Sequence, residues 1–574
     1  MPLMGSLYVG SSGLQTSQNA LNTTAHNLSN VDTVGYTRQQ VQQSNKSYNT
    51  LSINIDGIAN QQIGLGVAYS RVKQVRDIFL DTTYRKEAGR CSFYQTTSEV
   101  MEEAESLLGE LNGEAFQTNM HDLWTSIQEL AKDPSSSIVQ GLLVQRAGEF
   151  IERAVNIYEG MTFYQNNLNL QIKQQVEKIN EYGNRILKLN EQIRCVEAGG
   201  IERANDYRDA RNQLLDELGQ MANITVQEGN YGEVTVRIEN VDFLKGDTCY
   251  EIGLDQDETT GFYTPYWPQN AGYVIKDDGK RYYNIQGAEV FNLKKEISSD
   301  KNTDIGGLKA MLLARGDHQA DYTDIEKDYS AVSESVIMNI QAEFDQLVHN
   351  ISTKVNSILA EAAGVMQGDL TLADGSVLTN VQYCESDAEG YMRKENGSPI
   401  QLFSKITTDS YSKVTGADGK DYWVYNEEDF TQQDSLYTLK NIRVDEELQQ
   451  KPASLSFMLK DGSVDVETAE KLKDAFTEEI YTLNPEVKKS TTFLDYYNDL
   501  VSQVANSGSV YRSIFTNQED TVEATENARQ QIIGVSSDEE LSNMIRFQNA
   551  FNASSRYINA ISDMLAHLIN TLGV

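Results

Sequence analysis

Histidine and cysteine are the side chains best suited to metal binding and nucleophilic catalysis, and this chain uses few of them. Its five histidines lie far apart and form neither H-x-x-x-H nor H-E-x-x-H: His26, His121, His318, His349 and His567. Its four cysteines contain no C-x-x-C pair: Cys91, Cys195, Cys249 and Cys384. The sequence therefore predicts no zinc site and no disulfide framework, and we expect no cofactor.

Other patterns that could support catalysis are incomplete. Gly64-Leu65-Gly66 lacks the third glycine and the Lys-Ser/Thr of a phosphate loop, so it is more typical of a turn between strands. Asp255, Asp257 and Glu258 resemble the start of a calcium loop, but Thr260 stands where that loop needs glycine. No G-x-S-x-G elbow occurs. We expect no enzymatic activity.

The charge balance excludes further classes of function. The chain has 574 residues, with 48 Lys plus Arg against 84 Asp plus Glu, and a formal net charge of −36. Such a surface disfavours binding to nucleic acid and to anionic lipid. No window approaches the roughly 18 continuous apolar residues of a membrane span, and the first residues, MPLMGSLYVGSSG, do not have the pattern of a cleaved signal peptide.

The sequence at both ends of the chain predicts helices with a narrow apolar stripe. In the first 30 residues Leu7, Leu14, Leu21 and Leu28 recur every seven positions, with small or polar residues between them. Near the other end, steps of three and four connect a mostly apolar series: Met544, Phe547, Phe551, Ser554, Ile558, Ile561, Leu565, Leu568 and Leu572. Ser537 and Glu540 have the spacing of a capping box, which predicts where this last helix begins.

The middle of the chain alternates between two sequence patterns, one typical of helices and one typical of strands. Stripes at helical spacing occur between 91 and 224, where Ile172, Val176, Ile179 and Ile186 share a face and Gly199-Gly200 ends the pattern, and again as one long stretch from Asp324 to Ala363. Two segments rich in Tyr, Val, Thr and Gly alternate as strands do.

We therefore predict a mainly α, α+β fold: an elongated rod with its terminal helices paired as a coiled coil, a central helical bundle and two β-rich inserted domains. The expected units are 1–50 with 525–574; 51–224 with 305–363 and 442–524; 225–304; and 364–441.

One motif near the first helix carries a family resemblance. The run from His26 to Gln39, HNLSNVDTVGYTRQ, resembles the N-terminal signature of bacterial flagellar axial proteins, the rod, hook and hook-associated subunits. Here Asn30 would cap the helix, Gly35 would permit a turn, and Tyr36 and Arg38 would return the chain to the assembly. Val34 stands where the family usually has proline, so the turn loses a preset dihedral angle.

Further matches follow in the expected order. The segment from Gly64 to Arg85 resembles the family's G-x-G-V…R-x-x-D-x-F-L stretch, and 539–572 resembles its common C-terminal helix. In the middle, NDYRDARNQLLDEL from Asn205 to Leu218 resembles hook-associated members of the family, with Asn212 where aspartate is usual. Gly306-Gly307-Leu308, followed by Arg315 and Asp317, resembles a second segment of those members.

The resemblance implies a structural subunit that is secreted unfolded by the flagellar export apparatus and becomes part of the extracellular flagellum. It would form a homo-oligomeric ring at the end of the hook, and its partners would be the hook protein, a second junction protein and an export chaperone. No nucleic acid and no membrane insertion are implied. The residues expected to carry assembly are Leu7, Leu14, Leu21, Leu28, Asn30, Gly35, Tyr36, Arg38, Met544, Phe547, Phe551, Ile558, Ile561, Leu565, Leu568 and Leu572.

Three other functions stay open from the sequence. The chain could be the hook subunit itself, which should share both ends but lack the long helical middle. It could be a surface adhesin that binds a partner through its tyrosine-rich insertions. It could also be an enzyme fused to an axial scaffold, although no motif supports that function.

Overall fold

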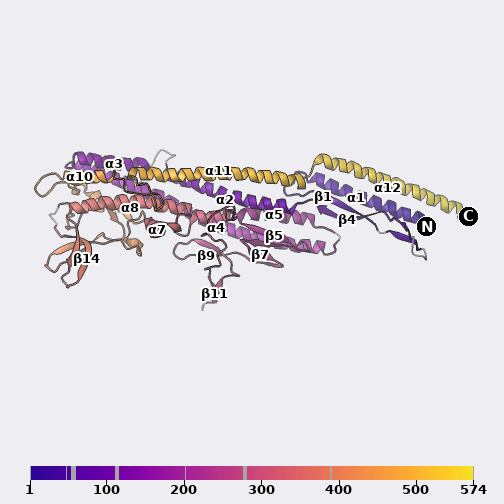
Figure 1. The fold of residues 1–574 in the computed structure, drawn as a ribbon, viewed down its shortest axis with the longest axis horizontal. Coiled ribbons are helices and arrows are strands. Elements are labelled where there is room, and N and C mark those ends of the chain that lie inside the picture. Colours follow the sequence, from indigo (N-terminus) through magenta and orange to yellow (C-terminus); the bar gives the residue numbers. More distant parts are fainter. Residues whose placement is uncertain are drawn as a thin grey trace.

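A computed structural model describes residues 2–46, 48–53, 60–109, 116–200, 202–275, 281–387 and 391–572. The molecule is a long, mainly helical rod (Figure 1). The terminal helices α1 (Pro2–Ser29) and α12 (Ser537–Leu572) lie side by side at one end. At the opposite end lie α3 (Phe116–Lys132) and α10 (Val466–Ala475). Small β-sheets project from one side of the rod, so the mainly α fold with added β structure is confirmed.

Long helices form the stem of the rod: α2 (Ile78–Leu108), α4 (Ser137–Glu197), α5 (Asn205–Met221) and α11 (Phe493–Ile533). The apolar stripe predicted on α4 is confirmed, since Ile172, Val176, Ile179 and Ile186 are all buried. The helix ends two residues before Gly199-Gly200, and Gly200 takes a left-handed conformation with φ of 69°. Because buried residues recur at helical spacing along the whole segment, these 61 residues form one continuous helix.

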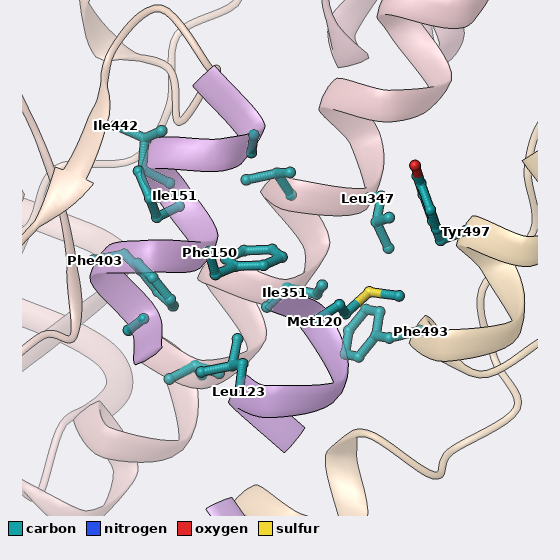
Figure 2. Packing of buried hydrophobic residues seen from close by; sticks show 14 of the residues in the cluster. Met120, Leu123, Phe150, Ile151, Leu347, Ile351, Phe403, Ile442, Phe493 and Tyr497 are labelled. Atoms are coloured by element: carbon teal, nitrogen blue, oxygen red, sulfur yellow. The ribbon is translucent and has the colours of Figure 1, made fainter. Parts of the chain in front are cut away.

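The main core lies where α3, α4 and α11 meet α8 (Val336–Ala362). Phe116 is at its centre, with ring centroids 5.2 Å from Phe150, 5.0 Å from Phe344 and 4.9 Å from Tyr497. Figure 2 shows Phe150, Leu347 and Ile351 packed between these helices. Such interlocking aromatic and aliphatic contacts stabilise this end of the rod.

The stretch from Asp324 to Ala363 is not the single helix that its spacing predicts. It contains α7 (Tyr322–Asp328), a 3-10 turn, η2 (Tyr329–Ala331), and then α8. The prediction was wrong because polar caps interrupt the helix. The Asp328 side chain accepts a hydrogen bond from the Ser330 N–H, and Ser335 takes an extended conformation just before α8.

The β-structure consists of small antiparallel sheets. One has the order β5 (Ile224–Glu228), β6 (Val234–Ile238), β7 (Val241–Lys245) and β8 (Thr248–Cys249), and another has the order β13 (Met366–Thr371), β14 (Val377–Glu385), β17 (Asp421–Tyr425) and β16 (Tyr411–Thr415). The two-stranded pairs are β1 (Gln39–Asn45) with β4 (Val67–Gln74), β2 (Asn49–Ile53) with β3 (Asn60–Ile63), β9 (Gly253–Gln256) with β10 (Tyr263–Tyr266), β11 (Gly272–Ile275) with β12 (Arg281–Asn284), and β15 (Phe403–Lys405) with β18 (Ile442–Val444).

Short helices fill the remaining connections. These are α6 (Gly307–Arg315), α9 (Glu446–Gln450), η3 (Gln433–Ser435) and η4 (Pro452–Ser454). The β1–β4 pair contacts α1 and extends beside it toward the end of the molecule (Figure 1). The terminal helices are therefore braced on one side by a thin β-ribbon.

Candidate assembly interface

Small residues let the two terminal helices approach each other closely. A Cβ added to Gly10 would lie 2.7 Å from Ile558 Cγ1, and one added to Gly13 would lie 2.9 Å from Ser554 Oγ. Ser17, which continues this spacing along α1, is also buried. A larger side chain at Gly10 or Gly13 would push the helices apart, so these glycines set the distance between α1 and α12.

The predicted leucines of α1 do not form its most buried line. Leu7, Leu14, Leu21 and Leu28 are all half-buried, whereas the small and polar residues between them are more enclosed. Close helix approach explains this, because the small residues face α12 and the leucines flank the contact. Each leucine therefore keeps apolar surface that this single chain leaves uncovered.

The apolar stripe of α12 is also only partly covered. Ile561 is buried, but Met544, Phe547, Phe551, Ile558 and Leu565 are half-buried, and Leu568 is exposed. Leu572 is the last residue of α12, and its side chain lies outside the described residues. Further large apolar side chains of this helix are exposed, namely Leu541, Ile545, Tyr557, Met564 and Ile569.

A tight turn follows α1. The Asn30 side-chain amide donates to the carbonyl of His26 at 2.9 Å and so satisfies one of the last carbonyls of the helix. Gly35 has φ of +82°, a conformation that glycine adopts readily. The Tyr36 hydroxyl then donates to Asn27 Oδ1 at 2.7 Å, which holds the returning chain against α1. Val34, at the position where the family usually has proline, is exposed.

Arg38 joins the two ends of the chain. Its Nε lies 3.0 Å from Glu540 Oε1, and its Nη1 lies 3.0 Å from Glu539 Oε2. Asn27 Nδ2 donates to the other Glu540 oxygen at 3.2 Å. The backbone N–H of Arg38 donates to the carbonyl of Ile533 at 2.8 Å. These contacts bring together α1, the segment at Arg38, the end of α11 and the start of α12. We call the group of Arg38, Asn27, Ile533, Glu539 and Glu540 the Arg38 clasp.

The capping box predicted for Ser537 and Glu540 does not form. Ser537 is exposed, and the Glu540 carboxylate turns away from the helix end toward Arg38 and Asn27. The cause is electrostatic, because a guanidinium and an amide are stronger partners for a 2% exposed carboxylate than one backbone N–H. α12 instead begins with the Glu540 N–H donating to the carbonyl of Ser536 at 3.0 Å.

A buried network connects this clasp to the rod. The Thr37 N–H donates to Asp209 of α5 at 3.2 Å, and Gln74 Nε2 donates to the other oxygen of the same carboxylate at 2.8 Å. Nearby, Arg85 and Arg529 each lie 2.7 Å from Asp216. Burial raises the pKa of Asp209 to about 6. Polar contacts thus join the segment after α1 and the end of β4 to α5, and join α2 and α11 to α5.

A groove of ≈ 1070 Å³ is bordered by α1, β1 and α12 and includes residues of the clasp in its wall. Its walls come from α1, β1 and α12, including Thr16, Val41, Phe547 and Ala550. The groove leaves one side of the half-buried Phe547 accessible. A second polypeptide segment could reach the apolar stripe there.

Asn27, Glu540 and Asp209 are the contact residues that sequence reasoning missed. Asn27 lies within the recognised motif, and its burial beside three partners shows that it organises the turn. The sequence indicates Glu540 only as a capping-box residue and Asp209 only as part of the 205–218 motif, so neither pattern reveals these contacts. Each becomes important only through a partner that is far away in the chain.

The described residues contain neither a cluster suited to a metal ion nor a helix suited to crossing a membrane. Within them, no group of three His, Cys, Asp or Glu side chains is arranged to bind a metal ion. The four cysteines are free thiols. Across the described ranges, each helix is too short or too polar to cross a lipid bilayer.

Removing the Glu540 carboxylate is expected to loosen the clasp. Glu540→Ala leaves Arg38 and Asn27 without their buried partner, so the free energy of opening this region should fall by about 1–3 kcal/mol. Hydrogen exchange of the amides in 25–45 and 537–550 on the full chain measures the change. Glu539→Ala is the matched control, because Glu539 contacts the same arginine but is 62% exposed, and its effect should stay near zero. Equal effects would contradict the clasp.

Known proteins resemble the chain along its length. Residues 101–371 match the family described as flagellar hook-associated protein FlgK helical domain, 7–37 match flagella basal body rod protein, and 531–571 match the flagellar basal body rod FlgEFG protein C-terminal family. Flagellar hook-associated protein 1 of Bacillus subtilis (strain 168) is 27% identical over 565 residues, which cover 98% of this chain and 97% of that protein. The protein of the same name from Salmonella typhimurium is 24% identical, and the aligned part covers 97% of this chain and 98% of that protein.

A solved structure shows the same fold. The flagellar hook junction protein FlgK from Burkholderia pseudomallei aligns with a TM-score of 0.50 at 11% identity, over 78% of this chain and 99% of that one. Terminal rod-type segments around a long helical stem define a flagellar axial protein, a structural class. Within that class, the chain is similar along its full length to flagellar hook-associated protein 1, and the resemblance found in its sequence is confirmed.

Proposed function

We propose that copies of this chain form a ring at the junction between hook and filament, and that the terminal helices hold the ring together. The observation that carries this proposal is the incomplete burial of the α12 stripe. Phe547 and Phe551 are half-buried in the single chain, and Leu568 and Ile569 are exposed. Exposed apolar residues clustered on one helix are typical of a surface that another protein covers.

The energetics favour coupling between folding and assembly. Complete burial of one large apolar side chain contributes about 1.5–3 kcal/mol. Isolated helices are marginal in water, and α1 and α12 make most of their contacts with each other, while α1 also contacts the β1–β4 ribbon. We infer that the helix pair is loosely held in the free subunit and becomes rigid when neighbouring copies bury the rest of the stripe.

The proposed route to the ring is export of the unfolded chain through the flagellar secretion channel. Four free cysteines suit such a route, because an unlinked chain passes a narrow channel more easily. The large negative charge would keep exported subunits soluble. Proposed partners are the hook protein on one side, a second junction protein on the other, and an export chaperone before secretion.

We further propose that the parts of the chain divide this work. The terminal segments 1–50 and 525–574 would line the inner tube, and 51–224, 305–363 and 442–524 would form the surrounding rod. The β-rich segments 225–304 and 364–441 would face the solvent.

Limited proteolysis of the purified subunit, with circular dichroism, tests the proposal. We expect 1–50 and 530–574 to be cut first while the middle resists, and we expect both ends to become protected in assembled hook–filament particles. A free subunit that resists cleavage to both ends would overturn the proposal. Electron microscopy of a strain lacking the protein adds an independent readout: hooks without filaments support a junction role, whereas missing hooks would indicate the hook subunit.

One observation favours a second candidate, adhesion. All residues of β11 are exposed, including Tyr273, Val274 and Ile275. The strand projects from the side of the rod (Figure 1), where such a flat apolar edge is available for pairing. A pull-down with the full chain and with a Val274→Lys variant tests this function, and equal capture of partners by both would argue against it.

A further inference from the structure

Two large apolar side chains are exposed where the stem of the rod begins. Ile78 and Phe79 are the first residues of α2, and each is 74% exposed. The Phe79 N–H donates to Asp77 Oδ1 at 2.8 Å, so a helix cap fixes the backbone of this pair. Adjacent large apolar side chains that are open to solvent are typical of a surface that another protein covers. We call Ile78 and Phe79 the α2 knob.

A cleft lies at the same level of the rod as the knob. It has a volume of ≈ 500 Å³, and its walls come from the turn after α1, from α5 and from the end of α11. Arg76 and Tyr84, which precede and follow the knob in the sequence, both line it. Tyr84 is only about 7.5 Å further along the α2 axis than Phe79. We call this space the junction cleft, and its apolar side chains are Val31, Val34, Tyr84, Ile533 and Val535.

Part of the apolar lining of the cleft is open to solvent. Val34 is 87% exposed and Val31 is also exposed, whereas Ile533 is buried. The turn that carries the two valines is held in place, because the Tyr36 hydroxyl donates to Asn27 Oδ1 at 2.7 Å. A fixed cleft with uncovered apolar side chains can receive apolar side chains of another molecule.

The knob and the cleft lie on different sides of α2. Phe79 and Tyr84 are five residues apart and therefore point about 140° apart around the helix axis. Tyr84 faces α11, because the Arg529 guanidinium lies 4.0 Å from its ring centroid. The knob of one chain thus points away from the cleft of the same chain and is available to the cleft of a parallel neighbour.

The knob is accompanied by a positive charge. Lys86 is exposed on the same face of α2 as Phe79, about 20° away around the axis, and it forms no ion pair with another described residue. Of the carboxylates beside it, Glu87 is bound by Arg90 at 2.8 Å, and Asp77 caps the helix. Lys86 is therefore available to a carboxylate of another chain.

The junction cleft has an excess of negative charge. Its lining has four carboxylates and two guanidinium groups, namely Asp32, Asp216, Glu217, Glu526, Arg76 and Arg529. The α5 wall is less suited to a further cation, since Arg185 and Lys188 of α4 border Glu217 there. We therefore expect a cation of a neighbouring copy at the α11 wall.

The knob and Lys86 match the cleft in their order along the rod. Gln518 of α11 donates to Glu87 Oε2 at 2.6 Å, next to Lys86, and the first α11 residue that lines the cleft is Glu526. The exposed Glu523 lies between these two positions and about 60° from Glu526 around the α11 axis. With the knob at the level of the cleft, Lys86 therefore reaches the level of Glu523 and Glu526.

We propose that neighbouring copies of this chain touch at the base of the stem, with the α2 knob of one copy in the junction cleft of the next. Phe79 would cover Val31 and Val34, and Lys86 would face Glu523 and Glu526. A contact between two different patches repeats from copy to copy and closes into a ring when the rotation allows. This inference rests on the proposed ring and adds to it a contact outside the terminal helices.

Truncation of the knob tests this contact on the full chain. We expect Phe79→Ala to reduce incorporation of the subunit at the hook tip about tenfold, because one large apolar side chain is no longer covered. Phe163→Ala is the matched control, since Phe163 of α4 is 78% exposed, and it should leave incorporation unchanged. Urea unfolding should give both variants the stability of the wild type. No loss with Phe79→Ala, or equal losses in both variants, overturns the proposal.

Val34→Asp tests the receiving side of the contact. Alone it should also reduce incorporation about tenfold, because a carboxylate replaces an apolar contact surface. Combined with Phe79→Ala it should cause little further loss, because both changes remove the same contact. A loss of about a hundredfold in the combined variant would show two independent effects and would overturn the proposal.

Cross-linking between two kinds of subunit gives a direct readout. In a Cys195→Ser background, which removes the exposed native thiol, Phe79→Cys subunits and Val34→Cys subunits are produced in one strain. Oxidation of the assembled particles should give disulfide-linked dimers when both kinds of subunit are present, and monomers when either is present alone. Mixed particles that give only monomers would overturn the side-to-side arrangement.

These variants also separate the contact from the ring itself. Normal incorporation of Phe79→Ala and Val34→Asp, together with failure of a charged variant in the α12 stripe, would reject the knob contact and leave the proposed ring intact. Normal incorporation of all three variants would reject both the knob contact and a ring held by the terminal helices.

Discussion

Phe551→Asp is expected to abolish incorporation of the subunit and to leave the rod folded. Phe551 lies on the half-buried stripe of α12, and a carboxylate there would have to lose its water when neighbouring helices close over it. The cost of burying an unpaired charge is several kcal/mol per subunit, and a ring repeats that cost at every copy. Filament growth and immunodetection at the hook tip, in a strain that carries only this variant, measure the effect.

The neighbouring residue supplies the control. Asn552 is exposed on the same helix, so Asn552→Asp adds the same charge without entering the stripe. It should support filaments of ordinary length. Normal growth with Phe551→Asp, or equal failure of both variants, would reject the role of the stripe.

Asp345→Ala is expected to be the most destabilising change in the rod. The fully buried Asp345 accepts hydrogen bonds from the Leu439 N–H at 2.6 Å and the Tyr322 N–H at 3.0 Å. Its loss leaves two buried donors unpaired, so the free energy of unfolding should fall by about 2–4 kcal/mol. Urea unfolding measures it. Asp374→Ala removes an exposed carboxylate that also accepts from a backbone N–H, and should change stability by less than about 1 kcal/mol.

The raised pKa values of two buried carboxyl groups, including that of Asp345, predict how the free energy of unfolding depends on pH. Burial, with the nearby charge of Asp321, raises the pKa of Asp345 to about 8, and burial raises the pKa of Glu343 to about 7. The folded chain therefore holds protons that the unfolded chain releases, so the free energy of unfolding falls as pH rises from about 4 to 8. Asp345→Asn removes one of these groups and should flatten that fall. An unchanged slope would contradict the assignment.

Local patterns predicted the parts of the fold that depend on neighbours in sequence. The stripe from Ile172 to Ile186 specified α4 because each residue lies one or two helical turns from the next and all face one core. The turn at Gly35 was also predictable from the local sequence, because its left-handed backbone conformation favours glycine.

Contacts between distant segments were not predictable. Arg38 and Glu540 are 502 positions apart, and nothing in one sequence pairs them. Asp345 looked like part of an ordinary helix, although two backbone donors from α7 and from residue 439 define its role. The polar interruptions around Asp328 and Ser335 were hidden by an apolar spacing that continues across them.

The pairing of α2 with α11 has a consequence for when the molecule can become compact. Gln518 donates to Glu87 from 431 positions away, and Arg512 contacts Glu102 from 410 positions away. α2, in the early part of the stem, therefore stays uncovered until α11, near the end of the chain, has been made. A loop spanning most of the polypeptide must then close before α11 can pack on α2. An incomplete chain therefore stays open by topology alone.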